Sequence, residues 1–173
     1  MLLHTGSMPD DDARPAAPTP GEERALGAMT AAGLAFRVVR HGRVSSLAEA
    51  AAARGVDPRD VIKTLVARLA DDDYVFVLVP GDRTISWPKL RTLLGVSRMS
   101  MPDADTARAA TGYERGTITP FGSTTAWPVI ADERMCGREV SLGAGAHGVA
   151  AVVDADAAIA ARGGRIADVT EPE

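Results

Sequence analysis

Two apolar runs decide the fold of this chain: VIKTLVARL at residues 61–69 and YVFVLVPG at residues 74–81. Both runs are short and rich in β-branched residues, and a polar break with three aspartates separates them. This pattern predicts two paired β-strands. Because each run is apolar on both faces, we expect both strands to lie in the middle of a sheet.

Lys63 interrupts the first of these runs. Side chains alternate between the two faces of a strand, so Lys63 shares a face with Leu65, Ala67 and Leu69. An ammonium group on an apolar row is costly to bury unless it meets an anionic partner or opens into a cleft. The chain has 17 arginines and two lysines, so a lysine here is not background usage. Lys63 is therefore either a paired, solvent-reaching side chain or part of a functional site.

The composition indicates one globular domain. The chain has 173 residues, of which 46% are hydrophobic and 4% aromatic, so its core must be built from Val, Leu, Ile and Ala. A single cysteine, Cys136, excludes an internal disulfide and favours a reducing compartment. We see neither a signal-peptide pattern nor an apolar run long enough to span a bilayer. The expectation is a cytoplasmic protein with no membrane partner.

The net charge of −4 is concentrated near the start of the sequence. Residues 1–24 contribute −3, which leaves the rest of the chain nearly neutral. This balance argues against a protein that coats nucleic acid, but it allows a local basic patch that grips a nucleic-acid end. Residues 1–20 are acidic and rich in proline, which is typical of a disordered tail, and residues 21–173 are expected to form one domain.

Short helices and strands are expected along the rest of the chain. Helix signals cover residues 22–33, 47–54, 88–94, 104–110 and 154–162. Further strand signals cover residues 36–40, 96–100, 127–131, 139–142 and 148–153. Ser45 or Ser46 can cap the second helix, and Asp103 can cap the fourth. Without strict alternation of strand and helix, the order predicts an α+β fold with a mixed sheet.

A loop at Thr111–Gly122 contains three glycines and a proline. Loops punctuated in this way are often functional, although a plain turn connector is the alternative. The loop matches neither of the common glycine-rich nucleotide-binding patterns. The histidines and Cys136 lack metal-ligand spacing, so we expect no metal site and no cofactor. His147 is either a loop residue or a catalytic base.

Six segments together resemble the YbaK family of free-standing relatives of the editing (INS) domain of bacterial prolyl-tRNA synthetase. They are VIKTLV (61–66), VPGDR (79–83), TGY (111–113), GTITPFG (116–122), PVIADE (128–133) and GAGAHG (143–148). Their order and approximate spacing match that family over roughly residues 25–170. The resemblance implies an α+β fold with a mixed, curved sheet flanked by short helices. It also implies hydrolysis of mischarged aminoacyl-tRNA.

The resemblance assigns roles to particular residues. Lys63 is expected to hold the phosphate or the 3′-terminal adenosine of the tRNA, with Thr64 beside the pocket. Gly116 and Pro120 match a GxxxP loop whose backbone would surround the aminoacyl ester and position water. Such backbone amides can stabilise a developing oxyanion. Lys63, Gly116 and Pro120 are thus the expected catalytic residues.

A second glycine-rich loop is expected to line the substrate pocket at Gly143 and His147. Many family members carry serine where this chain has Gly143, so it lacks any hydroxyl contribution there. Tyr113 and Phe121 are aromatic candidates for the pocket rim, with a core role equally open for Phe121. Small side chains should be preferred, because the expected walls are backbone loops at glycines: Gly112, Gly116, Gly122, Gly143 and Gly145.

The resemblance therefore implies a deacylase that acts in trans and removes alanine or cysteine from the acceptor end of proline-specific tRNA. Prolyl-tRNA synthetase is a further candidate partner. Two alternatives stay open: another small esterase, and a non-catalytic module that binds the acceptor end or a synthetase. Contact with tRNA should be small and aided by arginines such as Arg83 and Arg98.

The tail should be dispensable for folding. Residues 1–20 have too little apolar surface to pack, so we expect their removal to change the melting temperature little. Thermal unfolding of the full chain and of the truncated chain checks this. A large fall in melting temperature would mean that the segment packs against the domain.

Overall fold

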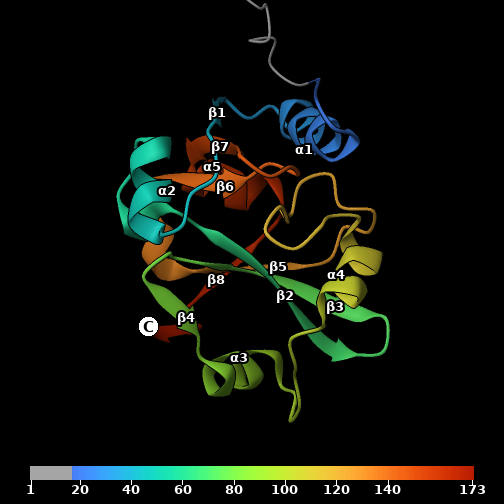
Figure 1. Ribbon diagram of the computed structural model, residues 1–173. Coiled ribbons are helices and arrows are strands. Elements are labelled where there is room, and N and C mark those ends of the chain that lie inside the picture. Colours follow the sequence, from blue (N-terminus) through green and yellow to red (C-terminus); the bar gives the residue numbers. More distant parts are fainter. Residues whose placement is uncertain (1–16) are drawn as a thin grey trace, which may run out of the picture.

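The computed structural model describes residues 17–173, which form short helices around small β-sheets (Figure 1). The helices are α1 (Pro20–Ala31), α2 (Leu47–Arg54), α3 (Trp87–Leu94), α4 (Ala104–Thr111) and α5 (Ala155–Ala161). The strands are β1 (Phe36–Arg40), β2 (Lys63–Ala70), β3 (Asp73–Val79), β4 (Arg83–Ile85), β5 (Val129–Asp132), β6 (Glu139–Gly143), β7 (Val149–Asp154), β8 (Arg165–Ala167) and β9 (Thr170–Pro172). Single 3-10 turns cover Pro58–Asp60 and Glu133–Met135.

The strands form one mixed sheet and two antiparallel ones. The mixed sheet has the order β2-β3-β5-β8, in which β2 and β3 are an antiparallel hairpin and the other two pairings are parallel. The second sheet has the order β1-β7-β6, and β4 pairs with β9. Figure 1 shows α5 and α2 beside the β1-β7-β6 sheet and α3 at the opposite end of the molecule. The expected α+β fold with a mixed, curved sheet is confirmed.

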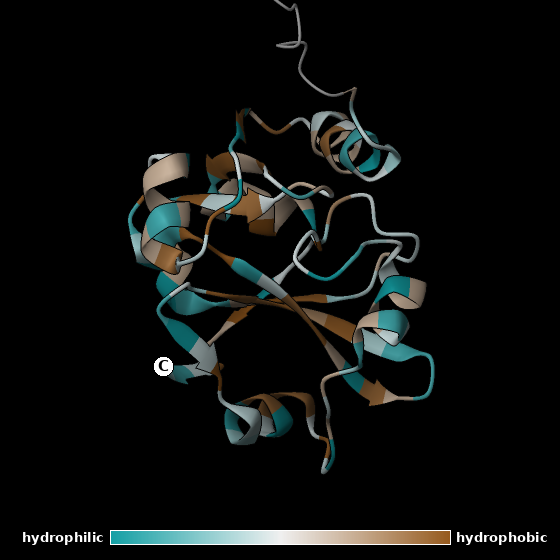
Figure 2. Ribbon diagram, viewed as in Figure 1, coloured by the Kyte–Doolittle hydropathy of each residue, from teal (hydrophilic) through white to brown (hydrophobic). Residues whose placement is uncertain are grey.

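Strand β3 lies between two hydrophobic clusters. Phe76 and Leu78 pack into one cluster with residues of β6, β7 and α5. Val75, Val77 and Val79 pack into the other, against β4 and α3. The hairpin strands are accordingly brown over most of their length in Figure 2. The prediction of a central strand that is apolar on both faces is confirmed for β3.

Strand β2 is an edge strand, which corrects the expectation that it lies in the middle of the sheet. Within residues 17–173, strand pairing on its outer side is limited to isolated bridges near its ends, from Val61 to Ser141 and from Arg68 to Ser100. The prediction of a strand at residues 96–100 is also wrong, because that segment contributes only the single bridge at Ser100. An apolar edge strand is tolerated here because neighbouring segments partly cover it.

Side chains cap the helices where the sequence predicted them. Ser46 Oγ accepts a hydrogen bond from Glu49 N at 3.1 Å, and Asp103 Oδ1 accepts one from Thr106 N at 2.7 Å. Thr19 caps α1 in the same way, so the last residues assigned to the tail belong to the first helix. The remainder of the expected tail, residues 1–16, lies outside the described residues. A truncation that tests the tail should therefore stop before Thr19.

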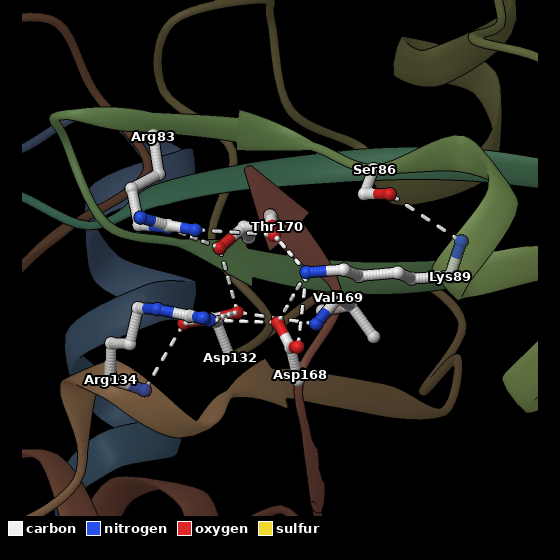
Figure 3. A network of polar contacts seen from close by, with 8 residues as sticks. All are labelled: Arg83, Ser86, Lys89, Asp132, Arg134, Asp168, Val169 and Thr170. Atoms are coloured by element: carbon white, nitrogen blue, oxygen red, sulfur yellow. Dashed lines mark hydrogen bonds and ion pairs between the residues drawn. The ribbon is translucent and has the colours of Figure 1, made fainter. Parts of the chain in front are cut away.

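Asp132 anchors the C-terminal strands, which the sequence analysis missed (Figure 3). Its side chain is fully buried, and Oδ2 accepts hydrogen bonds from Thr170 Oγ1 at 2.8 Å and from Val169 N at 3.3 Å. Arg134 Nη1 lies 3.1 Å from the same carboxylate oxygen. Burial of a carboxylate is stable only when it is paired and hydrogen-bonded in this manner.

The network continues to the surface through Asp168. This carboxylate lies 2.8 Å from Arg134 Nη1 and 3.0 Å from Lys89 Nζ. The hydrogen bond from Arg134, followed by that from Lys89, lowers the pKa of Asp168 below its usual value. The network thus joins α3, the end of β5 and the β8–β9 segment.

Over residues 17–173, no helix has the length and apolar character that crossing a membrane requires.

Replacing Asp132 with alanine should destabilise the fold strongly. The change would leave the Thr170 hydroxyl and the Val169 N–H buried without their acceptor, at a cost of about 2–4 kcal/mol in the free energy of unfolding. Urea unfolding of Asp132→Ala measures it. Asp168→Ala is the matched control, since that side chain is 40% exposed and its loss should be much smaller. Equal losses for the two variants would contradict the assigned anchor.

Candidate functional site

A cavity with a volume of about 640 Å³ lies against the outer edge of β2. Its walls come from β2 and the two residues before it, the segment 101–107 that leads into α4, the loop after α4, the end of β6 and the end of α2. The lining residues are Arg54, Val61, Ile62, Lys63, Thr64, Leu65, Val66, Met101, Pro102, Asp103, Ala104, Ala107, Arg115, Gly116, Ile118 and Gly143. A mostly apolar cavity of this size with a few polar groups is typical of a small-molecule site.

The backbone of β2 faces this cavity. Ile62 N donates to Ser141 O at 2.9 Å and Arg68 N donates to Ser100 O at 2.8 Å, so both N–H groups point away from β3. Backbone groups alternate in direction along a strand, and the N–H and C=O groups of Thr64 and Val66 therefore point to the same outer side. In the part of the chain that the structure describes, no strand pairs with that side between the two bridges. The open edge offers donors and acceptors to a ligand.

Thr64 adds a hydroxyl group without a partner. Its Oγ1 is buried, and it makes no hydrogen bond within residues 17–173. A buried polar group that is left unsatisfied costs about 1–3 kcal/mol, so such groups usually have a reason to persist. Thr64 is also one of the residues that line the cavity, which makes its hydroxyl a candidate contact for a ligand there.

Lys63 lines the cavity, but its ammonium group is held. Nζ donates to Arg83 O at 2.5 Å and lies 3.8 Å from Glu173 Oε2, and the side chain is one-third exposed. Lys63 therefore has both an internal carbonyl partner and a loose anionic partner. An ammonium carries three donors, so it can still bind a further acceptor.

The two glycine-rich loops pack against each other beside the cavity. Gly145 N donates to Thr117 O at 3.0 Å, and a Cβ built on Gly143 would come within 3.1 Å of Ile118 O. Gly116 has a φ of +88°, which favours glycine, and it lies at the cavity wall. The structure thus brings four of the predicted site residues to one cavity: Lys63, Thr64, Gly116 and Gly143.

Three predicted residues lie in the core instead. Tyr113 and Phe121 are 1% and 2% exposed, and Tyr113 Oη donates to Phe121 O at 2.6 Å. This corrects the expectation that Tyr113 forms the pocket rim, and of the two roles left open for Phe121 it is the core role that is found. Pro120 is also buried outside the cavity lining, and its carbonyl accepts a hydrogen bond from Arg162 Nε at 2.9 Å. These residues position the loop rather than contact the cavity.

The expectation of glycine walls is also only partly met. Gly116 and Gly143 line the cavity, whereas the other three glycines allow close packing elsewhere. A Cβ at Gly122 would clash with Arg24 O at 2.4 Å, and one at Gly145 would clash with Gly21 O at 2.3 Å. Gly112 ends α4 with a φ of +78° against Arg24. Apolar side chains from residues 61–66 and 101–107, together with Ile118, therefore supply most of the cavity lining.

His147 lies beside the cavity rather than in it. Its ring approaches Gly116, and Nε2 is 3.5 Å from Glu114 Oε2. The side chain is 68% exposed and borders a neighbouring cleft that also contains Gly116. His147 is thus placed at the entrance to the site.

The sequence analysis missed Arg54 and misassigned Arg83. Arg54 ends α2 and reaches the cavity, where burial lowers the pKa of its guanidinium. Arg83 instead donates to Thr170 Oγ1 at 2.7 Å and to Thr170 O at 3.3 Å, so its guanidinium is occupied within the fold. Arg98 is exposed and outside the cavity lining. No pattern around Arg54 distinguishes it from an ordinary basic residue at a helix end.

Asp103 is the carboxylate of the cavity wall. The hydrogen bond from the backbone of Thr106 lowers the pKa of this carboxylate most, and a hydrogen bond from the Thr106 side chain adds to the effect. Asp103 is therefore ionised and a weak base. Within residues 17–173 no three side chains of His, Cys, Asp or Glu gather closely enough to hold a metal ion. The site therefore offers backbone groups, one free hydroxyl and basic side chains.

Comparison with curated proteins finds prolyl-tRNA ligases. The chain is 39% identical over 94 residues to proline–tRNA ligase of Heliobacterium modesticaldum, which is 54% of this chain and 16% of the ligase. It is 28% identical over 109 residues to the same ligase of Bacillus cytotoxicus, which is 63% of this chain and 17% of the ligase. The chain thus spans about a sixth of these relatives.

Solved structures agree with this relationship over nearly the whole chain. A proposed trans-editing enzyme for prolyl tRNA synthetase superposes with a TM-score of 0.82 at 25% identity, covering 90% of this chain and 99% of that one. A hypothetical protein of known crystal structure gives a TM-score of 0.78 at 25% identity, covering 86% of this chain and 100% of the other.

The family model of the aminoacyl-tRNA editing domain matches residues 41–159. These residues include β2, both glycine-rich loops and every residue that lines the cavity. The resemblance to YbaK-type proteins is confirmed. Because the match spans well over half of the sequence, this protein belongs to the family of aminoacyl-tRNA editing domains.

Proposed function

We propose that this protein is an aminoacyl-tRNA deacylase that acts in trans on proline-specific tRNA charged with a small wrong amino acid, alanine or cysteine. The observation that carries the proposal is the open edge of β2. It directs the backbone groups of Thr64 and Val66 toward a cavity that Thr64, Lys63 and Gly116 line, and the Thr64 hydroxyl has no hydrogen-bond partner within residues 17–173. Family membership and the proposed trans-editing structural relative support the same activity.

In the proposed reaction, water attacks the carbonyl carbon of the ester that links the amino acid to the terminal ribose. The bond between that carbon and the ribose oxygen breaks, and the ribose oxygen takes a proton, so the products are the free amino acid and uncharged tRNA. The developing oxyanion needs hydrogen-bond donors. The N–H groups of Thr64 and Val66 and the backbone around Gly116 are the candidates.

A strong base is not among the cavity-lining side chains. Asp103 is ionised with a lowered pKa, which makes it a weak proton acceptor. Catalysis in this proposal therefore rests on positioning of the water and on the ribose hydroxyl of the substrate. A low demand for acid–base chemistry suits an activated ester.

We assign Lys63 to the anionic or adenosine part of the substrate. Its ammonium already donates to Arg83 O, which fixes its position, and Glu173 is the loose partner that a phosphate would replace. Selection of small amino acids would come from the packed walls at Ile118, Val66 and Ala107. Such a pocket separates side chains that differ by one methylene by about 1–3 kcal/mol, so related small residues should also react.

The partner in this proposal is the acceptor end of the tRNA, with prolyl-tRNA synthetase as a second candidate. We further propose that residues 21–173, together with the cap at Thr19, form one domain and that the protein works in the cytoplasm, where its substrate is made and used. A non-catalytic module that binds the acceptor end is the alternative. The lack of a strong base among the cavity-lining residues, and the glycine at Gly143, favour that alternative.

A panel of mischarged tRNAs tests the proposal. With EDTA present, proline-specific tRNA charged with alanine or cysteine should be hydrolysed well above the spontaneous rate. Phenylalanyl-tRNA should be hydrolysed more slowly. Lys63→Ala should keep the fold and lose the activity, whereas Arg165→Gln, at the opposite edge of the mixed sheet, should match wild type. Binding of tRNA without hydrolysis of any member would favour the non-catalytic module.

Thr64→Val should separate stability from activity. Valine has the shape of threonine but no hydroxyl, so removing an unsatisfied buried oxygen should leave the free energy of unfolding unchanged or raise it by up to about 1 kcal/mol. Deacylation should nevertheless fall about tenfold if the hydroxyl contacts the substrate. Urea unfolding and single-turnover rates measure the two effects. Full activity of the variant would remove Thr64 from the site.

A further inference from the structure

A second cleft adjoins the cavity at Arg54 and Gly116, which line both. It has a volume of about 450 Å³ and is bordered by residues of the β1–α2 connection and by the loop that precedes β7. Every ionisable residue in its lining is basic: His41, Arg43, Arg54 and His147. This charge contrasts with the net charge of −4 of the chain as a whole.

Arg54 is a partly buried cation without a carboxylate partner within residues 17–173. Nη1 donates to Ser141 Oγ at 3.0 Å and Nε to His41 Nε2 at 3.4 Å, while Nη2 makes no hydrogen bond in the same part of the chain. Burial lowers the pKa of this guanidinium. Desolvating a charge without a counter-ion is costly, so an anionic ligand would relieve the cost.

Two arginines of neighbouring segments, at the end of β1 and before β6, have acidic partners. Arg138 pairs with Asp60 at 2.5 Å, and Arg40 pairs with Glu22. Two acids beside cleft-lining residues already have partners. Glu114 lies on His147, and Glu49 accepts hydrogen bonds from the backbone and hydroxyl of Ser45.

We propose that this cleft binds a phosphate group of the 3′ strand of the tRNA acceptor end and leads that strand past Arg54 into the cavity. The inference rests on the proposed function, because it assigns the path of the same substrate. Arg54 and the exposed Arg43 supply the guanidinium groups, whose planar donors match phosphate oxygens. His147, at the entrance, adds a further nitrogen donor.

The competing explanation is structural: Arg54 ties α2 to β6 through Ser141. A tie of this kind would affect stability, but it would not respond to the phosphates of the substrate. The salt dependence of RNA binding separates the two roles, because each phosphate contact that is lost lowers the slope of log K against log salt by about 1.

Binding to uncharged RNA is the first test. Fluorescence anisotropy with a labelled acceptor minihelix ending in CCA would compare wild type, Arg54→Gln and Arg43→Gln at several salt concentrations. Each variant should bind about tenfold more weakly, with a slope reduced by ~1. Arg165→Gln, on strand β8 at the far edge of the mixed sheet, is the matched control and should bind as wild type. Wild-type affinity and slope in both cleft variants would overturn the proposal.

Kinetics with two substrates is the second test. An aminoacyl-tRNA carries the phosphates, whereas 3′-aminoacyl-adenosine carries the same ester without them. Arg54→Gln and Arg43→Gln should lose about tenfold more kcat/KM on the tRNA than on the nucleoside ester. Equal losses on both substrates would mean that the arginines only support the cavity. If wild type hydrolyses neither substrate, the proposed activity fails, and the binding measurement still decides whether the cleft holds RNA.

Discussion

The structure depends on the burial of strand β3, from Tyr74 to Val79, between two hydrophobic clusters. Its alternate side chains face β6 and β7 on one side and α3 on the other, so neither face can be exposed to water. Each Å² of apolar surface that this strand removes from water stabilises the fold by roughly 25 cal/mol. Its burial leaves β2 as the outer strand, and the candidate site is built on that strand's free side.

Much of this fold could be predicted because its signals are local. Apolar runs and capping residues depend on neighbours in the chain, and both the hairpin and the caps at Ser46 and Asp103 are found where expected. Position within a sheet is not a local property. An apolar run such as β2 looks central whether a strand or a cavity wall covers its outer side, and this ambiguity produced the wrong assignment. Strands β8 and β9 were not predicted, because Asp132 holds them from a distant part of the sequence.

The residues of the candidate site likewise fall into those with a local sequence signal and those without one. Lys63 and Gly116 could be singled out because a lysine in an apolar strand and a heavily punctuated loop are unusual in themselves. Tyr113 and Phe121 resemble rim residues in sequence, yet the hydrogen bond between them and their burial place both in the core. Arg54 could not be recognised from the sequence. What distinguishes it is that no carboxylate within residues 17–173 pairs with it. Only three-dimensional contacts reveal such an imbalance.

The open edge of β2 also bears on how this protein avoids self-association. Free strand edges are the usual starting points for aggregation, and proteins commonly protect them with charged side chains or proline. Here the bridges at Val61 and Arg68 close both ends of the free stretch, and the segment 101–107 rises beside it. A strand from another molecule, which needs a long straight approach, is shut out, while a compact ligand can still reach the backbone. The same enclosure that forms a binding site therefore protects the chain against intermolecular β-pairing.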